Sequence, residues 1–588
     1  MSEPQKKKGL SPELRLLLAF LLSLGAMSLW MHYFVPKPPA RQPAATGTAK
    51  PAAPATPPAQ TPAAQAAPAS AAPAGPAAAA AAAVPVKADT QERTFVVESD
   101  LYRVEFTNRG AVVRSWQLKK YTDDAKPRRT LDLVHADAAR QTGGWPFSLM
   151  LDDATDETTV NNALYQVEQG PTDAQGHTTL RFSWSDGHLE VSKVFTFDGS
   201  YVVQVEASVR HAGAPIVSGL AWRGGFGDVT VQNPAPAEQV NVIFDTAGKL
   251  QNLPHKKLNA PDQTPRAFWY RGMLYAGIED RYFAAVFLAP LDAAPGNLAT
   301  RYWKLEREVK KGEQTEQEPV AEVAVGTGDA GPFALRVFVG PKDYDALKKM
   351  NPPLHALVQF GWMEFIADPL FHLLKWLHTY IPNWGWAIIV LTLVINMLLF
   401  PLRISSYRTA LKMQRIGPEV KQIQERYKKY KMNDPKKAEM NQEIMAIYSR
   451  EGINPMGGCF QMLLQMPIWF GLNTALRYSI ELRHATWVWV TDLSAKDPYY
   501  ILPVTVGLSM YLVSKMTPMT STDPNQEMMM KIMPVSMAVM FVVFPFSSGL
   551  ALYILTSSVV GIGQQWYLNK THPASAIVPV KPGRGKKA

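Results

Sequence analysis

The last third of this 588-residue chain contains long runs without a charged side chain. Four such runs lack Asp, Glu, Lys and Arg altogether: Thr379–Leu402, Gly452–Leu476, Pro498–Ser514 and Ile532–Asn569. A helix that crosses a bilayer needs about 17 to 25 predominantly apolar residues. Each of the first three runs therefore predicts one spanning helix. The last is long enough for two, separated by the helix-breaking residues 545–549, so the sequence predicts a membrane protein with five clustered spans.

A further apolar run, Leu16–Val35, lies near the N-terminus and follows Lys6, Lys7, Lys8 and Arg15. The apolar region of a cleaved signal peptide is usually about 7 to 15 residues long. The greater length of this run favours an uncleaved membrane anchor, with a cleaved signal peptide as the alternative. Its positively charged flank predicts a cytoplasmic N-terminus.

Between the anchor and the spans, the composition changes twice. Residues 36–88 are dominated by Pro and Ala and predict an extended tether. Residues 89–345 then show apolar residues at every second position, as in Tyr102, Val104 and Phe106, which is typical of short antiparallel strands. We expect a β-sandwich here. The scattered His188, His211, Glu279 and Asp280 have no spacing that supports a hydrolytic or carbohydrate site.

Residues 346–383 combine apolar, aromatic and charged side chains, which predicts an amphipathic helix at the membrane interface. Trp384 and Trp386, together with Trp487 and Trp489, predict an aromatic belt at the outer headgroup level. The only cysteine, Cys459, cannot form an intramolecular disulfide and excludes zinc sites built on cysteine pairs.

The loop between the first two clustered spans is basic. Twelve Lys or Arg and six Asp or Glu lie between Arg403 and Glu451, which places this loop in the cytoplasm by the positive-inside rule. Two short helices, starting at Pro418 and Pro435, are expected to form a hairpin with one apolar seam. Its basic faces could be simply solvated beside anionic lipids, or could dock an acidic or RNA-rich partner. The candidate docking residues are Lys428, Lys429, Lys436 and Lys437.

Several polar residues interrupt the spans. Asn396 and Arg403 are two helical turns apart, about 10 Å along the axis, and so share one helix face. Residues of this kind usually face a protein interior or a wet cavity. The structural alternative is that they bridge helices, or that Arg403 extends to the inner headgroups. The candidate cavity residues are Asn396, Arg403, Gln461, Gln465, Asn473 and Thr505.

The run 454–460, Asn-Pro-Met-Gly-Gly-Cys-Phe, followed by Gln465, Met466 and Pro467, resembles the signature of the YidC membrane-protein insertases. The segment 497–503 and the Phe-Pro and Ser-Gly-Leu elements at 544–550 also resemble this family. The similarity extends over the order of all segments from residue 1 to 588, and the large outer domain is similar to that of the Gram-negative form.

This resemblance implies a protein of the bacterial inner membrane, with both termini in the cytoplasm and the large domain in the periplasm. The implied function is to insert and fold membrane proteins through a hydrophilic intramembrane groove, with newly made membrane proteins as clients and without catalysis, cofactor or metal. The implied partners are the Sec translocon, ribosomes or targeting factors at the basic hairpin and tail, and anionic lipids. The family's groove arginine aligns with Asn396, so Arg403 is the candidate for that role.

The predicted segments are an anchor (1–35), a tether (36–88), a periplasmic β-supersandwich (89–345), an interfacial helix (346–383), a five-helix core (384–569) with a cytoplasmic helical hairpin (404–455), and a basic cytoplasmic tail (570–588). Two other classes are less well supported. A secondary transporter would show repeated halves, and the chain has no such repeat. A membrane-anchored periplasmic enzyme would need a convergent site in the β-region.

Overall fold

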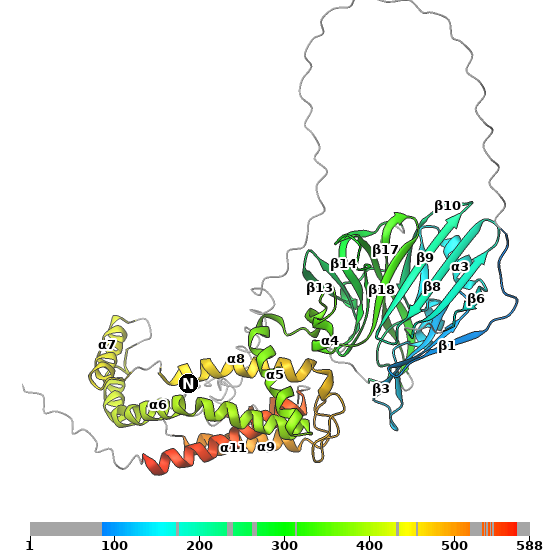
Figure 1. The fold of residues 1–588 in the computed structure, drawn as a ribbon. Coiled ribbons are helices and arrows are strands. Elements are labelled where there is room, and N and C mark those ends of the chain that lie inside the picture. The colour runs from blue at the N-terminus through cyan, green and yellow to red at the C-terminus, as the bar shows by residue number, and fades with distance from the viewer. Residues whose placement is uncertain are drawn as a thin grey trace, which may run out of the picture. The chain divides into compact units, whose positions relative to one another are not determined.

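The computed structural model describes residues 85–171, 176–231, 239–261, 267–311, 314–430, 434–453, 457–517 and 546–572, and single positions between 532 and 543. The predicted anchor (1–35), nearly all of the tether (36–88), most of the fourth clustered span and the tail after residue 572 lie outside these residues. Within the described part, a β-domain is followed by a group of helices (Figure 1).

The β-domain consists of two antiparallel sheets. The smaller sheet has the order β1 (Thr94–Glu98), β2 (Tyr102–Thr107), β3 (Val112–Thr122), β4 (Thr130–Asp132). The larger has the order β5 (Ser148–Leu151), β11 (Val217–Trp222), β17 (Gln314–Ala330), β16 (Leu298–Lys311), β14 (Tyr270–Glu279), β15 (Phe283–Leu288), β18 (Phe333–Pro341), β9 (Val202–His211), β8 (Leu189–Phe197), β7 (Thr178–Ser185), β6 (Gln166–Gln169). Three further strands belong to the larger sheet outside this order: β10 (Ala214–Pro215) pairs with β9, and β12 (Asn241–Thr246) pairs with β14 and with β13 (Lys249–Pro254).

The predicted alternation of apolar residues is confirmed in these strands. Along β8 every second side chain is buried, from Leu189 to Phe197. Phe106 of the smaller sheet packs against Phe182 and Phe195 of the larger one in a single core. Because buried side chains from both sheets meet in this core, the domain is a β-sandwich, as expected. The short helices α2 (Ala136–Thr142), α3 (Ala154–Asn162) and α4 (Tyr344–Lys348) belong to the same part of the chain.

The linker after β18 leads into the helices. It contains the 3₁₀ turns His355–Val358 and Gly361–Met363 and then α5 (Glu364–Tyr380). One side of α5 is buried through Ala367, Phe371 and Leu374, whereas Phe365 and Trp376 are exposed. This amphipathic pattern fits the predicted interfacial helix, but the helix does not begin at residue 346 as predicted: the end of α4 and two 3₁₀ turns precede it, and α5 begins at Glu364. Its place at a membrane surface stays a prediction.

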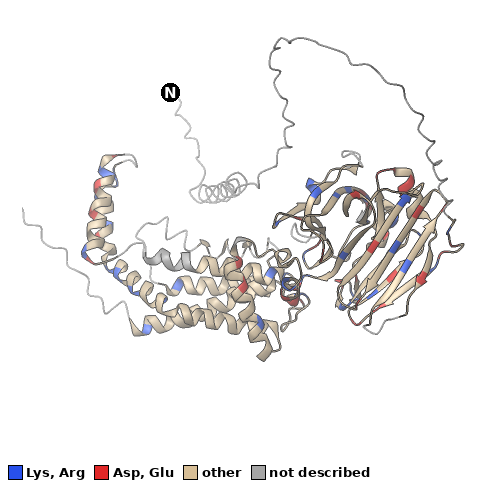
Figure 2. Cartoon of the chain, turned by 45° about the horizontal axis from the view of Figure 1, so that its top comes forward, with Lys and Arg blue, Asp and Glu red and all other residues tan. Residues whose placement is uncertain are grey.

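The remaining helices are α6 (Trp384–Arg426), α7 (Pro435–Arg450), α8 (Gly457–Tyr478), α9 (Ile501–Met516) and α11 (Ser548–Thr571). Leu391 of α6, Leu472 of α8, Val506 of α9 and Leu550 of α11 belong to one buried cluster. Figure 2 shows that charged residues are sparse on these packed helices and more frequent on α7. Among the described residues, α6 alone is both long and apolar enough to span a membrane, and the apolar helix α9 is shorter. The other clustered spans stay predictions.

One helix boundary was predicted wrongly. Pro418 does not begin a new helix, because α6 continues through Pro401 and Pro418 to Arg426. A proline removes one backbone donor from a helix, but packing can outweigh that loss. Here Ile416, Val420 and Ile423 of α6 pack with Ile447 of α7. Helix α7 begins at Pro435 as expected, with the Asp434 side chain accepting from the amide of Lys436.

Candidate functional site

Arg403 of α6 lies against α11. Its Nη1 donates to Oε1 of Gln564 at 3.0 Å, and its Nη2 donates to the main-chain oxygen of Gly561 at 3.2 Å. A Cβ atom at Gly561 would lie only 3.1 Å from Nη1, so the glycine leaves room for the guanidinium group. The arginine is therefore held in a defined position by two neutral acceptors.

Asn396 lies two turns away on the same side of α6. Its Nδ2 donates to the main-chain oxygen of Thr392 at 2.8 Å, and its Oδ1 accepts from the Ser557 hydroxyl at 3.3 Å. Gln564 connects the two positions, because its Nε2 donates to the main-chain oxygen of Asn396 at 3.3 Å. Asn396 and Arg403 thus face the same neighbouring helix and share one hydrogen-bonding partner.

The other predicted cavity residues are less closely associated. Gln465 of α8 donates to the Tyr553 hydroxyl of α11 at 2.9 Å. Asn473 is half-buried eight residues further along α8, which corresponds to about 12 Å. The Thr505 hydroxyl donates to main-chain oxygens of its own helix, those of Ile501 and Leu502. Gln461 is part of α8, but its side chain lies outside the described part of the structure.

The charge of Arg403 has no acidic neighbour in the described part of the chain, where no carboxylate lies within ion-pair distance of it. Some basic side chains elsewhere on these helices do have acidic partners, as in Arg450 with Glu419 at 2.7 Å and Arg426 with Glu443 at 2.9 Å. A cation held only by neutral dipoles can attract an anionic group that comes close to it. The Arg403 site is thus chemically suited to contact an acidic side chain.

Sequence reasoning missed the contribution of α11. The residues that meet α6 and α8 are Tyr553, Ser557, Gly561 and Gln564, all within the last uncharged run. Their spacing of four, four and three residues places them on one helix face. This periodicity was a usable signal, because a polar or small stripe on a spanning helix marks a contact with another helix. We refer to Asn396, Arg403, Ser557, Gly561 and Gln564 as the polar cluster.

The four lysines proposed for docking differ in their surroundings. Lys428 and Lys429 are exposed at the end of α6, and the Lys429 ammonium group lies 5.2 Å from the centroid of the Tyr430 ring. Lys436 is exposed but pairs with Glu439 at 3.2 Å, and Lys437 is half-buried. The charge available to a partner is therefore greatest at Lys428 and Lys429.

The scattered histidines and acids of the β-domain do not converge on a site. His211 pairs with Asp156 at the surface. Glu279 is fully buried and pairs with Lys342, while Asn252 and Gln359 donate to its other oxygen. Both carboxylate oxygens of Glu279 thus have hydrogen-bonding partners within the folded chain.

Asp124, His484 and Asp492 place one possible metal-ligating atom each within 4.8 Å of the others. No sequence motif indicated this group, because Asp124 is 360 positions away from His484 in the chain. Nε2 of His484 is hydrogen-bonded to Asp124 at 2.6 Å, and Oδ1 of Asp492 accepts from the Ser494 amide and hydroxyl. The group thus takes part in contacts between the β-domain and the segment after α8.

Comparison with known proteins covers both parts of the chain. The family described as YidC periplasmic domain matches residues 94–373, and the family described as 60Kd inner membrane protein matches residues 376–575. A protein of Citrifermentans bemidjiense named membrane protein insertase YidC is 36% identical over 95% of this chain and 99% of its own length. A protein of the same name from Syntrophus aciditrophicus is 32% identical over 94% of this chain and 99% of its own length.

Among solved structures, a crystal structure of an active YidC insertase with its first transmembrane domain resolved is 18% identical. The structural match covers 83% of this chain and 95% of the solved chain, with a TM-score of 0.33. The assignment therefore depends on the two matched families and on the sequence identity to full-length relatives. On that basis, the chain belongs to the YidC family.

Proposed function

We propose that this chain is a membrane-protein insertase that also assists the folding of its clients, and that it is not an enzyme. Its near full-length relatives carry the name membrane protein insertase YidC. The structural observation that supports the proposal most directly is the position of Arg403. Arg403 faces α11 within a mainly apolar group of helices, and Gln564 and the Gly561 carbonyl accept its hydrogen bonds.

In the proposed mechanism, the polar cluster lines a hydrophilic groove within a five-helix core, and Gln461, Gln465, Asn473 and Thr505 extend it. Moving one charge across hydrocarbon costs from about 3 to more than 10 kcal/mol. A polar groove that reaches part of the way into the membrane shortens the apolar distance. The short hydrophilic tail of a client enters this groove, and an acidic group on the tail pairs with Arg403.

Partitioning of the client's apolar segment into lipid supplies the driving force. The segment leaves the groove beside α8 and the preceding residue Met456, and beside the methionine-rich stretch around Met533. Flexible methionine side chains adapt to apolar segments of different shapes. The protein would act alone or together with the Sec translocon.

Localisation and topology complete the proposal. The chain would lie in the bacterial inner membrane with both termini in the cytoplasm and the β-domain in the periplasm. The basic hairpin formed by α7 and the end of α6 would contact ribosomes, targeting factors or anionic lipids through Lys428 and Lys429, aided by Lys436 and Lys437.

Purified full-length protein in proteoliposomes would test this function. Insertion of a labelled single-span client, measured by protease protection, should exceed that in protein-free liposomes. Transport of a small solute without client insertion would favour the transporter class. Turnover of a sugar substrate without client insertion would favour an enzyme, and either result would overturn the proposal.

A further inference from the structure

The segment that follows α8, residues 479–500, will be called the outer loop. It contacts the β-domain through both apolar and charged residues. Ile480 is buried within the main core of the β-domain. Just before the loop, Ala475 of α8 is buried in a second cluster with Tyr275 of β14 and Phe371 of α5. The end of α8 and the outer loop are thus packed directly against the β-domain.

Arg281 supplies the first polar connection. It lies in the turn between β14 and β15 and is only 7% exposed. Its Nε and Nη2 donate to the main-chain oxygen of Arg477 at 2.8 and 2.7 Å, and Nη2 also reaches the oxygen of Ser494 at 3.5 Å. The last carbonyl groups of a helix lack partners within the helix and attract cations. Arg281 therefore caps the C-terminal end of α8 from the β-domain.

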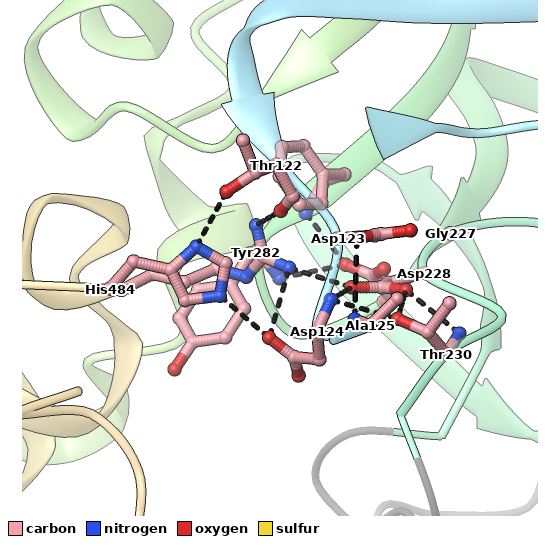
Figure 3. A network of polar contacts seen from close by, with 12 residues as sticks. Thr122, Asp123, Asp124, Ala125, Gly227, Asp228, Thr230, Tyr282 and His484 are labelled. Carbon is pink, nitrogen blue, oxygen red and sulfur yellow. Dashed lines mark hydrogen bonds and ion pairs between the residues drawn. The ribbon is translucent and has the colours of Figure 1, made fainter. Parts of the chain in front are cut away.

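Arg483 supplies the second connection, which extends from the outer loop to the β-domain. It belongs to the outer loop, and its Nη2 lies 2.7 Å from Oδ2 of Asp228, with both side chains 5% exposed. Its Nη1 donates to the main-chain oxygen of Thr122 at 2.7 Å. The guanidinium carbon lies 5.4 Å from the centroid of the Phe283 ring, within the range of a cation–π contact. Figure 3 shows the acceptors Thr122 and Asp228 converging on this part of the outer loop.

His484 extends this contact. Its Nδ1 lies 3.0 Å from the Thr122 hydroxyl and its Nε2 lies 2.6 Å from Oδ1 of Asp124 (Figure 3). Although partial burial opposes it, the hydrogen bond from His484 and the nearby Arg483 lower the pKa of the Asp124 carboxyl group. Asp124 is therefore an anion at neutral pH, which favours a close approach of the outer loop.

A third connection joins the outer loop to α5. Lys375 lies 2.9 Å from Glu481 of the loop and 2.6 Å from Asp345 of α4. Burial opposes the charge on Lys375, but the two carboxylates outweigh it and raise the pKa of this lysine. The outer loop is thus held from two sides, by the β-domain and by the interfacial helix.

The contacts of Arg281 and Arg483 are buried and directional, and they act at the end of the helix that carries Gln465. We propose that Arg281 of the β-domain and Arg483 of the outer loop are positioning residues for insertion: together they fix the outer end of α8 to the β-domain and thereby the position of α8 against α11. This inference depends on the proposed insertase function. It assigns a mechanical role to the β-domain, through two arginines on opposite sides of one contact.

The test compares Arg281→Gln and Arg483→Gln with the control Arg271→Gln. Arg271 is an exposed β-domain arginine that pairs with Asp329 at 2.9 Å and donates to the main-chain oxygen of Gly328, both within the β-domain. Full-length proteins carry Cys459→Ser and spin labels at the exposed positions Lys120 and Val488. Electron–electron distance distributions should broaden in both test variants and stay unchanged in the control.

Insertion of a single-span client into proteoliposomes is the second measurement. Both test variants should lose about two- to thirtyfold in initial rate, the range expected for coupling through a packed network. A bifunctional thiol crosslink between Thr122→Cys and His484→Cys, in the Arg483→Gln background, should restore the narrow distance distribution and the rate. If Arg483 only stabilised its immediate surroundings, the crosslink would not restore the insertion rate. Asp228→Asn provides a milder variant should Arg483→Gln fail to fold.

The outcomes separate the two proposals. Failure of the unmodified protein to insert any client would overturn the insertase function. Normal insertion by the unmodified protein and by variants with broadened distances would overturn only the positioning role. Unchanged distances in both variants would also overturn it, because the arginines would then not fix the outer loop.

Discussion

Arg403 and Gln564 are joined by a hydrogen bond of 3.0 Å between α6 and α11, and the amide group of the same Gln564 donates to the main-chain oxygen of Asn396. The glutamine therefore links the position where the family resemblance places an arginine to the position where this chain has one. Arg403 lies two helical turns from Asn396 along α6, and both residues belong to one hydrogen-bonded network.

Gln564→Leu should weaken the insertion of clients with acidic tails. The substitution keeps the approximate size of the side chain but removes one ligand of Arg403, which should leave the guanidinium less well oriented. We expect about a three- to tenfold loss, comparable to the net contribution of one ordinary hydrogen bond. Insertion rates in proteoliposomes would be compared with those of Ser557→Ala, which removes the hydrogen bond from the Ser557 hydroxyl to Asn396. Equal losses in the two variants would contradict a specific role of Gln564.

Topology can be tested with single cysteines in a Cys459→Ser background. Tyr430 lies in the basic segment and Val490 in the outer loop. Val490 is only 1% exposed, so the accessible probe position in this loop is its exposed neighbour Val488. A membrane-impermeant thiol reagent added to the periplasmic side should label a cysteine at position 488 and should not label one at position 430. Labelling of position 430 from the periplasm would contradict the proposed orientation.

The basic hairpin should act through Lys428 and Lys429. Changing both to Glu should leave the helices folded, because exposed charges contribute little to stability. It should reduce sedimentation of the protein with ribosomes or anionic vesicles, with the largest effect at low salt. The control changes the exposed β-domain residues Lys256 and Lys257 to Glu. Adding Lys436→Glu and Lys437→Glu should reduce binding further. If the hairpin variant and the control variant bind ribosomes and vesicles equally well, the basic face of the hairpin is solvated and does not dock a partner.

The stability of the β-domain should depend on pH through Lys193. This residue is fully buried, and its ammonium group donates to the main-chain oxygens of Gly110, Ala111 and Phe147. Burial lowers its pKa to about 7. Between that value and the ordinary lysine pKa, the unfolded chain binds more protons than the folded one, so stability should rise with pH.

The expected slope from Lys193 is up to ~1.4 kcal/mol per pH unit above pH 7, with no contribution below it. Urea unfolding of the solubilised protein, followed by near-ultraviolet circular dichroism of the buried tryptophans, would measure it. Lys193→Met should be less sensitive to pH in this window, whatever its absolute stability. Identical slopes in the two proteins would show that Lys193 does not titrate there.

Much of the fold could be predicted because its signals are local. Period-two alternation in segments such as Leu189–Phe197 identified the strands, and the Asp434–Pro435 pair identified the start of α7. Pro418 misled the prediction because a single residue type was weighted above the apolar spacing around it. The packing of Ile416, Val420 and Ile423 against α7 keeps the helix continuous.

The candidate site was predicted only in part. Asn396 and Arg403 stood out because polar residues in a spanning helix are costly. Their partners on α11 are separated from them by about 160 positions, and no local signal pairs one span with another. The same holds for Arg281 and Arg483, whose partners Arg477 and Asp228 come from distant segments.

The most direct test of the account moves the cation between the two positions. Arg403→Ala should impair clients with acidic translocated tails more than matched neutral clients, and Arg403→Lys should be milder because it keeps the charge. Asn396→Leu should have a smaller effect alone and worsen the Arg403→Ala defect. In an in vivo insertion assay with matched expression, Asn396→Arg should restore acidic-tail insertion to the Arg403→Ala protein. Equal loss for acidic and neutral clients, or no rescue by Asn396→Arg, would contradict a shared groove in which Arg403 supplies the charge.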